Sequence, residues 1–480
     1  MTKEKVSLFG YISMDPSEFI KLYQDNPEKG FAILKDGLHS GEVIDTRPNL
    51  MILERKFQVN LEETYETIRQ EQKEGNLTYP MKAFFGDISR SVYNHARNNP
   101  DLVIMDRNIN VDQMRVLYDS LRFPLTYVKG PPGTGKTQTL LNVILSAFEN
   151  KKTVLICSGN NKPVDGIIQR LSMKYKGEEV TFPFLRLGNN DEVDKALEVI
   201  YQRSISQHFY SNQEKPISQI QESHESEMKD LVSKLASYEE KQQTKEKIDT
   251  IKKFIKSPEN SDPSLKEYLE STLKEEQQKY DSLPEVTNEM VLSLFTPVEE
   301  DEKFQGMLYF YSLSFIEKLK SPEYEELRYI SYIVDKTERL KEFNEWTRSD
   351  SNLEKLLKVF PIIFTTNISA SKLGSGRTKF DLVIMDEAGQ CNVADALLPT
   401  ERGRNLLLVG DESQLRPVVL LEKGLDDHIR EKHHVDLSFS YSRNSILSSM
   451  KKRDNISKRI FLRYHYRCGK KIVNFANERF

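Results

Sequence analysis

The sequence predicts an α/β fold built on a parallel, doubly wound sheet. From about residue 108 to residue 187, short apolar stretches with strand character alternate with helical stretches, and the alternation resumes after residue 358. Such alternation is typical of a parallel sheet that is covered by helices on both faces. A glycine-rich loop follows the strand-like run Leu125–Lys129, and polar residues follow later strands. Because parallel sheets bind ligands at the carboxyl ends of their strands, these positions are the candidate site.

The glycine-rich loop reads GPPGTGKT and is followed by a helical stretch. Glycines let the backbone curl so that N–H groups point at phosphate oxygens, and the helix N-terminus adds positive potential. Lys136 is placed to bridge the β- and γ-phosphates, and the Thr137 hydroxyl is placed to bind Mg²⁺. The other residues expected around the phosphates are Gly130, Gly133, Thr134 and Gly135. The loop predicts that the chain binds a nucleoside triphosphate with Mg²⁺.

Two adjacent carboxylates end a second apolar strand, in the sequence FDLVIMDEAGQ. Asp386 at the strand tip is expected to complete the Mg²⁺ shell through water. Glu387 is expected to orient and deprotonate the attacking water. Adjacent acids are common on surfaces, so this interpretation depends on the phosphate loop upstream.

Two glutamines lie where a side-chain amide could contact a bound nucleotide. Gln414 follows the apolar strand Leu406–Val409, and its amide can bind a γ-phosphate or the attacking water without adding charge. We expect it to sense hydrolysis; an ordinary Gly-Asp turn is the alternative. Gln113 precedes the strand that leads into the phosphate loop, and an amide can both donate to and accept from an adenine edge.

A long insertion separates the loop from the acidic strand. Lys136 and Asp386 are 250 residues apart, too far for one compact α/β unit, and residues 190–358 are rich in Glu, Lys and Gln. Apolar or semi-apolar residues recur there at three- and four-residue spacing: Ile217, His224, Met228, Leu231, Leu235 and Tyr238. This stripe predicts a coiled-coil-like helix that ends at the prolines of residues 258–263, with a second helix from about Leu265. We expect a helical arm in which His224 packs.

Composition excludes some classes of protein. The net charge of the 480 residues is −4, which argues neither for nor against nucleic acid, but residues 443–480 hold 11 Lys or Arg against two acids. That asymmetry suits a surface for a phosphate backbone, and a solvated basic face is the alternative. No apolar run has transmembrane length. Three separated cysteines (Cys157, Cys391 and Cys468) exclude a disulfide framework, so a reducing cytoplasm is expected.

Residues 1–105 carry no catalytic constellation. Strand-like runs come first, and helical patterns follow at Leu61–Glu74 and Met81–Asn98. The strand-like runs are Val6–Ile12, Gly41–Ile44 and Leu50–Val59. We expect an α+β accessory region, with a small barrel and then stalk helices.

In content and order, the motifs INVDQ, GPPGTGKT, NxxVD, TT, DEAGQ, GDESQLRP and YHYR resemble those of superfamily 1B helicases. The likeness is to the branch that contains the nonsense-mediated-decay helicase, senataxin and the immunoglobulin-mu-binding helicase. It implies RecA-like P-loop NTPase domains. The first would be split over residues 106–189 and 359–440, and residues 441–480 would begin a second. The insertion, residues 190–358, would lie over the nucleic acid or dock a protein partner.

The resemblance also implies roles for single residues. Gln113 would read adenine, Tyr466 would stack on it, and Arg467 would reach the γ-phosphate. In this family single strands cross the loops of two further motifs, which correspond here to Asn161, Val164, Thr365 and Thr366. Because Gly159, Asn160 and Pro163 depart from the family's pattern, a purely structural role for these loops stays open.

Two motifs of the family, a GxxQGxE-like and a TRA-like sequence, do not occur in the chain. We expect these residues to be the N-terminal portion of a longer protein, or to be completed by a separate chain. Because the second motif would supply an arginine to the γ-phosphate, we expect the 480 residues alone to bind ATP, hydrolyse it slowly and not unwind. The expected function of the whole is ATP-dependent movement, 5′ to 3′, on single-stranded DNA or RNA. The alternative is an ATP-gated clamp or scaffold that does not unwind.

Overall fold

The computed structural model of the chain divides into two units, Met1–Val59 and Asn60–Phe480. The structure describes residues 14, 16–38, 61–90, 99–205, 221–256, 263–419, 421, 424–467 and 469.

In the first unit, the described elements are the helices α1 (Pro16–Asp25) and α2 (Pro27–Asp36). They meet at Asn26, whose side chain caps α2 by accepting the Lys29 N–H at 3.1 Å. The strands predicted at Val6–Ile12, Gly41–Ile44 and Leu50–Val59 lie outside the described residues.

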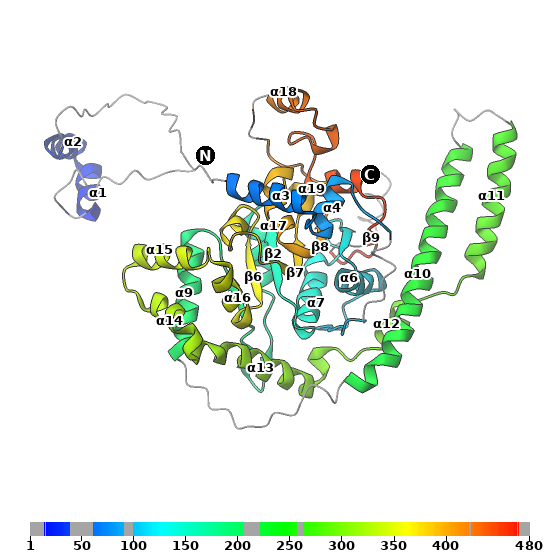
Figure 1. The fold of residues 1–480 in the computed structure, drawn as a ribbon, viewed down its shortest axis with the longest axis horizontal. Helices are drawn as coiled ribbons and strands as arrows, with labels where there is room; N and C mark the ends of the chain where they lie inside the picture. Colours follow the sequence, from blue (N-terminus) through cyan, green and yellow to red (C-terminus); the bar gives the residue numbers. More distant parts are fainter. Residues whose placement is uncertain are drawn as a thin grey trace. The chain divides into compact units, whose positions relative to one another are not determined.

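A seven-stranded sheet forms the centre of the second unit (Figure 1). Its order is β5-β6-β2-β7-β8-β1-β9, and every neighbouring pair is parallel. The strands are β1 (Leu125–Lys129), β2 (Val154–Ser158), β5 (Phe184–Arg186), β6 (Ile362–Thr366), β7 (Phe380–Met385), β8 (Gly403–Gly410) and β9 (Lys458–Phe461). A separate antiparallel ribbon pairs β3 (Lys174–Tyr175) with β4 (Glu178–Glu179). The prediction of a RecA-like parallel α/β fold is confirmed.

The strands are apolar on both faces because helices cover both. In β2, Leu155 packs into one core cluster and Ile156 into the other, as expected for a strand whose successive side chains point in opposite directions. One cluster contains α6 (Val111–Arg122), α7 (Lys136–Glu149), α8 (Asn161–Ile168) and α12 (Asn288–Leu292). The other contains α4 (Tyr79–Phe85), α9 (Asn190–Ile205), α14 (Glu325–Tyr332), α15 (Lys336–Trp346), α16 (Asp350–Val359), α17 (Val393–Glu401) and α19 (Ile446–Arg453). Helix α13 (Glu302–Glu317) contributes to both clusters.

The first sheet reaches further along the chain than predicted. The edge strand β9 pairs with β1, and α19 before it packs in the core, so residues 446–461 complete this sheet. The sequence analysis did not expect a strand in this segment, and the division into domains at residue 440 stays a prediction. At the other end, α3 (Glu62–Glu74) confirms its predicted helix. The predicted helix Met81–Asn98 has described residues only to Arg90, and α4 ends at Phe85 and packs in the core.

The insertion is only partly an arm. Helices α9 and α13–α16 cover the sheet, whereas α10 (Gln221–Lys256) and α11 (Pro263–Ser282) lie side by side (Figure 1). In α10 the predicted stripe is buried at Met228, Leu231, Leu235 and Tyr238, but these residues pack into the core cluster of the sheet. Ile217 and the side chain of His224 lie outside the described part. Within the described residues, no helix is both long enough and apolar enough to cross a membrane.

The α10–α11 contact is mainly polar. Ion pairs join Lys279 to Glu240 at 2.8 Å and Lys247 to Glu276 at 3.5 Å. Helix α11 has no buried residue. Exposed ion pairs contribute little to stability, so we expect the free ends of this pair of helices to separate more easily than the half of α10 that packs on the core. A remaining helix, α18 (Leu425–Lys432), follows β8.

Candidate nucleotide-binding site

The phosphate loop connects β1 to α7 at the carboxyl ends of the strands. Gly133 and Gly135 both have the left-handed backbone, with φ of 82° and 78°, and Gly135 is the N-cap of α7. A Cβ on Gly133 would lie 2.7 Å from Arg467 Cβ and from His465 Nε2. The two glycines therefore curl the loop and let a C-terminal segment lie against it.

Lys136 lies across the loop. Its Nζ donates to the Gly130 carbonyl oxygen at 3.0 Å and pairs with Glu387 Oε1 at 3.1 Å. Gly130 is required here because a Cβ would lie 2.7 Å from the Lys136 Cγ and Cδ atoms. The structure thus brings together the lysine and the predicted base.

The two carboxylates after β7 have different environments. Asp386 is buried, and burial, followed by the charge of Glu387, raises its pKa to about 6, against the lowering effect of Lys136. Glu387 has the left-handed backbone, with φ of 52°, which is strained for a residue with a side chain. Gln390 Nε2 donates to Glu387 Oε2 at 3.2 Å. Glu387 is therefore held between Gln390 and Lys136.

These residues fit the MgATP that the sequence predicts. The curled loop at the start of α7 offers N–H groups and positive potential to phosphates, and Lys136 adds a positive charge. Asp386 is a buried carboxylate beside a second carboxylate, and burial and then the charge of Glu387 raise its pKa; a divalent cation would stabilise the ionised form of both. Thr137, in the first turn of α7, and Asp386 are the residues that would hold Mg²⁺.

Gln113 and Tyr466 meet at the same loop. Tyr466 donates its N–H to the Gly133 carbonyl oxygen at 2.8 Å, and its hydroxyl accepts from Asn110 Nδ2 at 2.7 Å. Gln113 closes a capping box at the start of α6: its Oε1 accepts the Asn110 N–H at 3.0 Å, and its Nε2 donates to the Thr134 carbonyl oxygen at 3.1 Å. In this conformation Gln113 fixes the loop instead of presenting both amide atoms to a base. The Asn-x-x-Gln spacing was the overlooked signal.

An ion-pair network anchors the segment that carries Tyr466. Arg463 Nη1 lies 3.0 Å from Asp112 Oδ1 on α6, and its Nη2 lies 2.6 Å from Glu246 Oε1 on α10. The Asp112 side chain is fully buried, and burial raises its pKa, against the lowering effect of Arg463. Sequence reasoning missed this network, because its members lie far apart in the chain and belong to no motif.

A comparison with known protein families decides the identity of this fold. The model of the family described as AAA domain matches residues 108–422. The chain belongs to the AAA-domain family. With the relatives below, it is a member of the superfamily 1B helicases, in the branch predicted from the motifs.

Several curated relatives are helicases by name. An uncharacterized ATP-dependent helicase of Methanocaldococcus jannaschii is 24% identical over 80% of this chain and 46% of its own length. Helicase sen1 of Schizosaccharomyces pombe is 22% identical over 68% of this chain and 18% of its own length. DNA-binding protein SMUBP-2 of Mus musculus is 33% identical over 19% of this chain and 9% of its own length. The match thus spans less than half the length of each of these relatives.

In the AAA domain, the loop of the GDESQLRP motif packs directly against the loop of the DEAGQ motif. A Cβ on Gly389 would lie 2.6 Å from the Asp411 carbonyl oxygen, so the two loops touch through their backbones. Gln414 donates to Asp411 Oδ2 at 3.2 Å. Gln414 therefore lies on the loop next to the one that carries Glu387. Its amide forms a hydrogen bond with Asp411 and not with Lys136 or Glu387.

The four residues predicted to contact nucleic acid fall into two pairs. Val164 and Thr365 are fully buried, so in this conformation their side chains are not exposed, and their contact with nucleic acid stays a prediction. Both positions alternate into the core, as strand and helix periodicity requires. Asn161 is exposed and accepts from Arg186 Nη2 at 2.7 Å, and half-buried Thr366 donates to Ser369 Oγ at 3.0 Å.

Arg186 is a residue that the sequence analysis missed. It ends β5 at the same edge of the AAA domain's sheet as Asn161, and its Nε pairs with Asp165 Oδ1 at 2.9 Å. A charged residue directly after an apolar strand was the available signal.

Proposed function

We propose that this chain carries the ATP-hydrolysing part of a motor that moves 5′ to 3′ on single-stranded nucleic acid. The observation that carries the proposal is the contact of Lys136 with Glu387 on a phosphate loop against which Tyr466 and Arg467 also lie. Relatives named as ATP-dependent helicase, helicase and DNA-binding protein support a nucleic-acid track. The cytoplasm is the proposed compartment, from the use of cysteine.

Bound MgATP supplies the phosphoryl group whose transfer to water releases free energy. When the nucleotide binds, Lys136 would exchange its contact with Glu387 for phosphate oxygens, and the Glu387 carboxylate would then be available to accept a proton from water. Gln390 keeps that carboxylate oriented. Asp386 would hold the cation as a buried carboxylate, and Arg467, whose Cβ lies close to Gly133, would add positive charge beside the loop.

The proposed track runs over polar side chains at the carboxyl ends of β2, β5 and β6, of which Asn161 is exposed and Arg186 and Thr366 are partly buried. Asn161, Arg186 and Thr366 offer an amide, a guanidinium and a hydroxyl, which suit sugar and phosphate and carry no sequence preference. A charged guanidinium is also the group for bidentate phosphate contact.

Steady-state ATPase activity tests the proposal. Turnover by the 480-residue chain is measured with and without single-stranded DNA or RNA, beside Lys136→Ala and Glu387→Gln. We expect stimulation by one polymer and its loss in both variants. Turnover that survives both substitutions would contradict the assigned site.

A strand-displacement assay on forked substrates separates a motor from a clamp. The chain contains no TRA-like motif, so we expect slow turnover and no displacement by these 480 residues, and displacement only when a second RecA-like domain is supplied. ATP-dependent binding without stimulated turnover in that completed assembly would instead support the clamp.

A further inference from the structure

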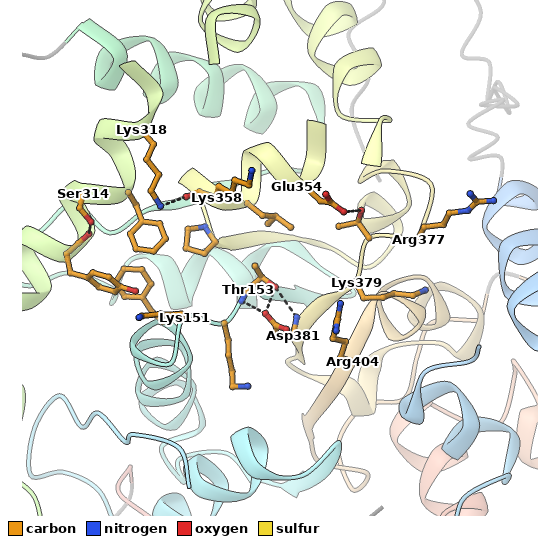
Figure 2. A pocket seen from close by; sticks show the side chains of 17 residues that line it. Lys151, Thr153, Ser314, Lys318, Glu354, Lys358, Arg377, Lys379, Asp381 and Arg404 are labelled. Carbon is orange, nitrogen blue, oxygen red and sulfur yellow. Dashed lines mark hydrogen bonds between the residues drawn. The ribbon is translucent and has the colours of Figure 1, made fainter. Parts of the chain in front are cut away.

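A cavity lies at the opposite edge of the sheet from the phosphate loop. It has a volume of about 640 Å³, and residues at the beginnings of several parallel strands line it (Figure 2). Thr153 precedes β2, Pro361 precedes β6, Asp381 is near the start of β7, and Arg404 is near the start of β8. We call it the basic cavity, because seven of its lining side chains are Lys or Arg and two are acidic.

Most of these cations form no ion pair within the part of the chain that the structure describes. Among the described residues, none forms an ion pair with Lys151, Lys152, Arg377 or Arg404. The two acids are committed elsewhere. Asp381 Oδ2 accepts from the Thr153 N–H and hydroxyl, both at 2.9 Å, and Glu354 accepts from the Thr378 hydroxyl at 3.5 Å (Figure 2).

Two lysines on one wall also repel each other. Lys318 donates to the Lys358 carbonyl oxygen at 3.0 Å and lies 3.9 Å from the centre of the Phe315 ring. Burial and then the charge of Lys358 lower the Lys318 pKa. Like charges held close by packed side chains are stabilised when an anion enters between them.

We propose that the basic cavity binds an anion that carries several phosphate groups. The cations come from different segments: Lys151 and Lys152 follow α7, Lys318 follows α13, Arg377 precedes β7, and Arg404 lies in β8. An anion with charge at several points meets more of them than a single phosphate does. Guanidinium groups bind phosphate in a bidentate manner, and the volume is in the range of small-molecule sites. The source is either a phosphodiester backbone or a small polyphosphorylated molecule.

Binding is measured in the Lys136→Ala background, so that the phosphate loop contributes less. The probes are tripolyphosphate, followed by calorimetry, and a fluorescent single-stranded oligothymidylate, followed by anisotropy. The cavity variants are Lys151→Gln/Lys152→Gln and Arg377→Gln/Arg404→Gln. The matched control is Lys266→Gln/Lys341→Gln, two exposed lysines on α11 and α15. Thermal melts confirm that each variant is folded.

We expect each cavity pair to weaken binding of at least one probe about tenfold, because each pair removes two charge-assisted contacts. The control should change affinity less than twofold, and higher salt should weaken binding. Loss of oligonucleotide binding identifies the backbone as the source, and loss restricted to tripolyphosphate identifies a small anion. Equal affinity in cavity and control variants, or no binding of either probe, overturns the proposal. The ATPase activity of the cavity pairs is measured in chains that keep Lys136, and it reports separately on the proposed function.

Discussion

The two edges of the central sheet differ in whether the cationic side chains compared below are paired with carboxylates. At the carboxyl edge, Lys136 and Arg186 each have a carboxylate partner within about 3 Å. At the amino edge, Arg377 and Arg404 have no such partner among the described residues. The first arrangement fixes side-chain positions before a ligand arrives, whereas the second leaves charge to be neutralised by one. Preorganisation suits catalysis, and uncompensated charge suits capture of an anion.

The largest expected effects lie at the carboxyl edge. Glu387→Gln should lower ATP hydrolysis about 10²- to 10⁴-fold and preserve nucleotide binding, because it removes the base and keeps the shape. Lys136→Ala should weaken nucleotide binding as well, because its charge faces the phosphates. Single-turnover hydrolysis and nucleotide titration measure both. If Glu387→Gln lost binding as fully as Lys136→Ala, Glu387 would be a structural partner of the lysine.

Arg463→Gln should cost up to about 3 kcal/mol of unfolding free energy, because it removes the ion-pair partner of buried Asp112 and leaves the charge of Arg115 and the Tyr238 hydrogen bond. Urea denaturation measures the loss. The double variant Asp112→Asn/Arg463→Gln is the matched control and should recover part of it. A loss below about 0.5 kcal/mol in the single variant would show that Asp112 is neutral or hydrated there.

Near the amino edge, Glu149 makes stability depend on pH. Burial and then the charge of Asp101 raise its pKa from 4.5 to about 7, so the folded state favours the protonated form. Its contribution to stability is therefore lost as pH rises from about 4.5 to about 7. Glu149→Gln should be more stable than the parent at pH 8, by at most about 3 kcal/mol, and equal to it near pH 4. Calorimetric melts, with exposed Glu345→Gln as control, test this; a pH-independent difference would contradict it.

The smallest effect should come from the unpaired cations. Arg404→Gln should change the unfolding free energy by less than about 0.5 kcal/mol, and in the stabilising direction at low salt, because it removes like-charge repulsion. Melts at low and high salt measure it. A clear destabilisation would mean that Arg404 has a partner in the folded chain, and the contrast between the two edges would weaken.

The sequence predicted local chemistry well, but it did not predict which residues distant in the chain contact one another. GPPGTGKT and the acidic pair could be predicted, because glycine torsions and strand ends fix where Lys136, Asp386 and Glu387 lie. Val164 and Thr365 could not be assigned to the interior, since the burial of a side chain depends on which elements cover it. The pairing of Arg463 with Asp112 also escaped, because it joins segments that meet only in the folded chain.

The double attachment of Arg463 has a mechanical consequence. One guanidinium holds α6 through Asp112 and α10 through Glu246, and it lies three residues before Tyr466. A displacement of α10 would therefore act on residues 463–467 beside the phosphate loop as well as on the core against which α10 packs. We therefore expect displacement of the α10–α11 pair and occupancy of the phosphate loop to affect the same segment, residues 463–467.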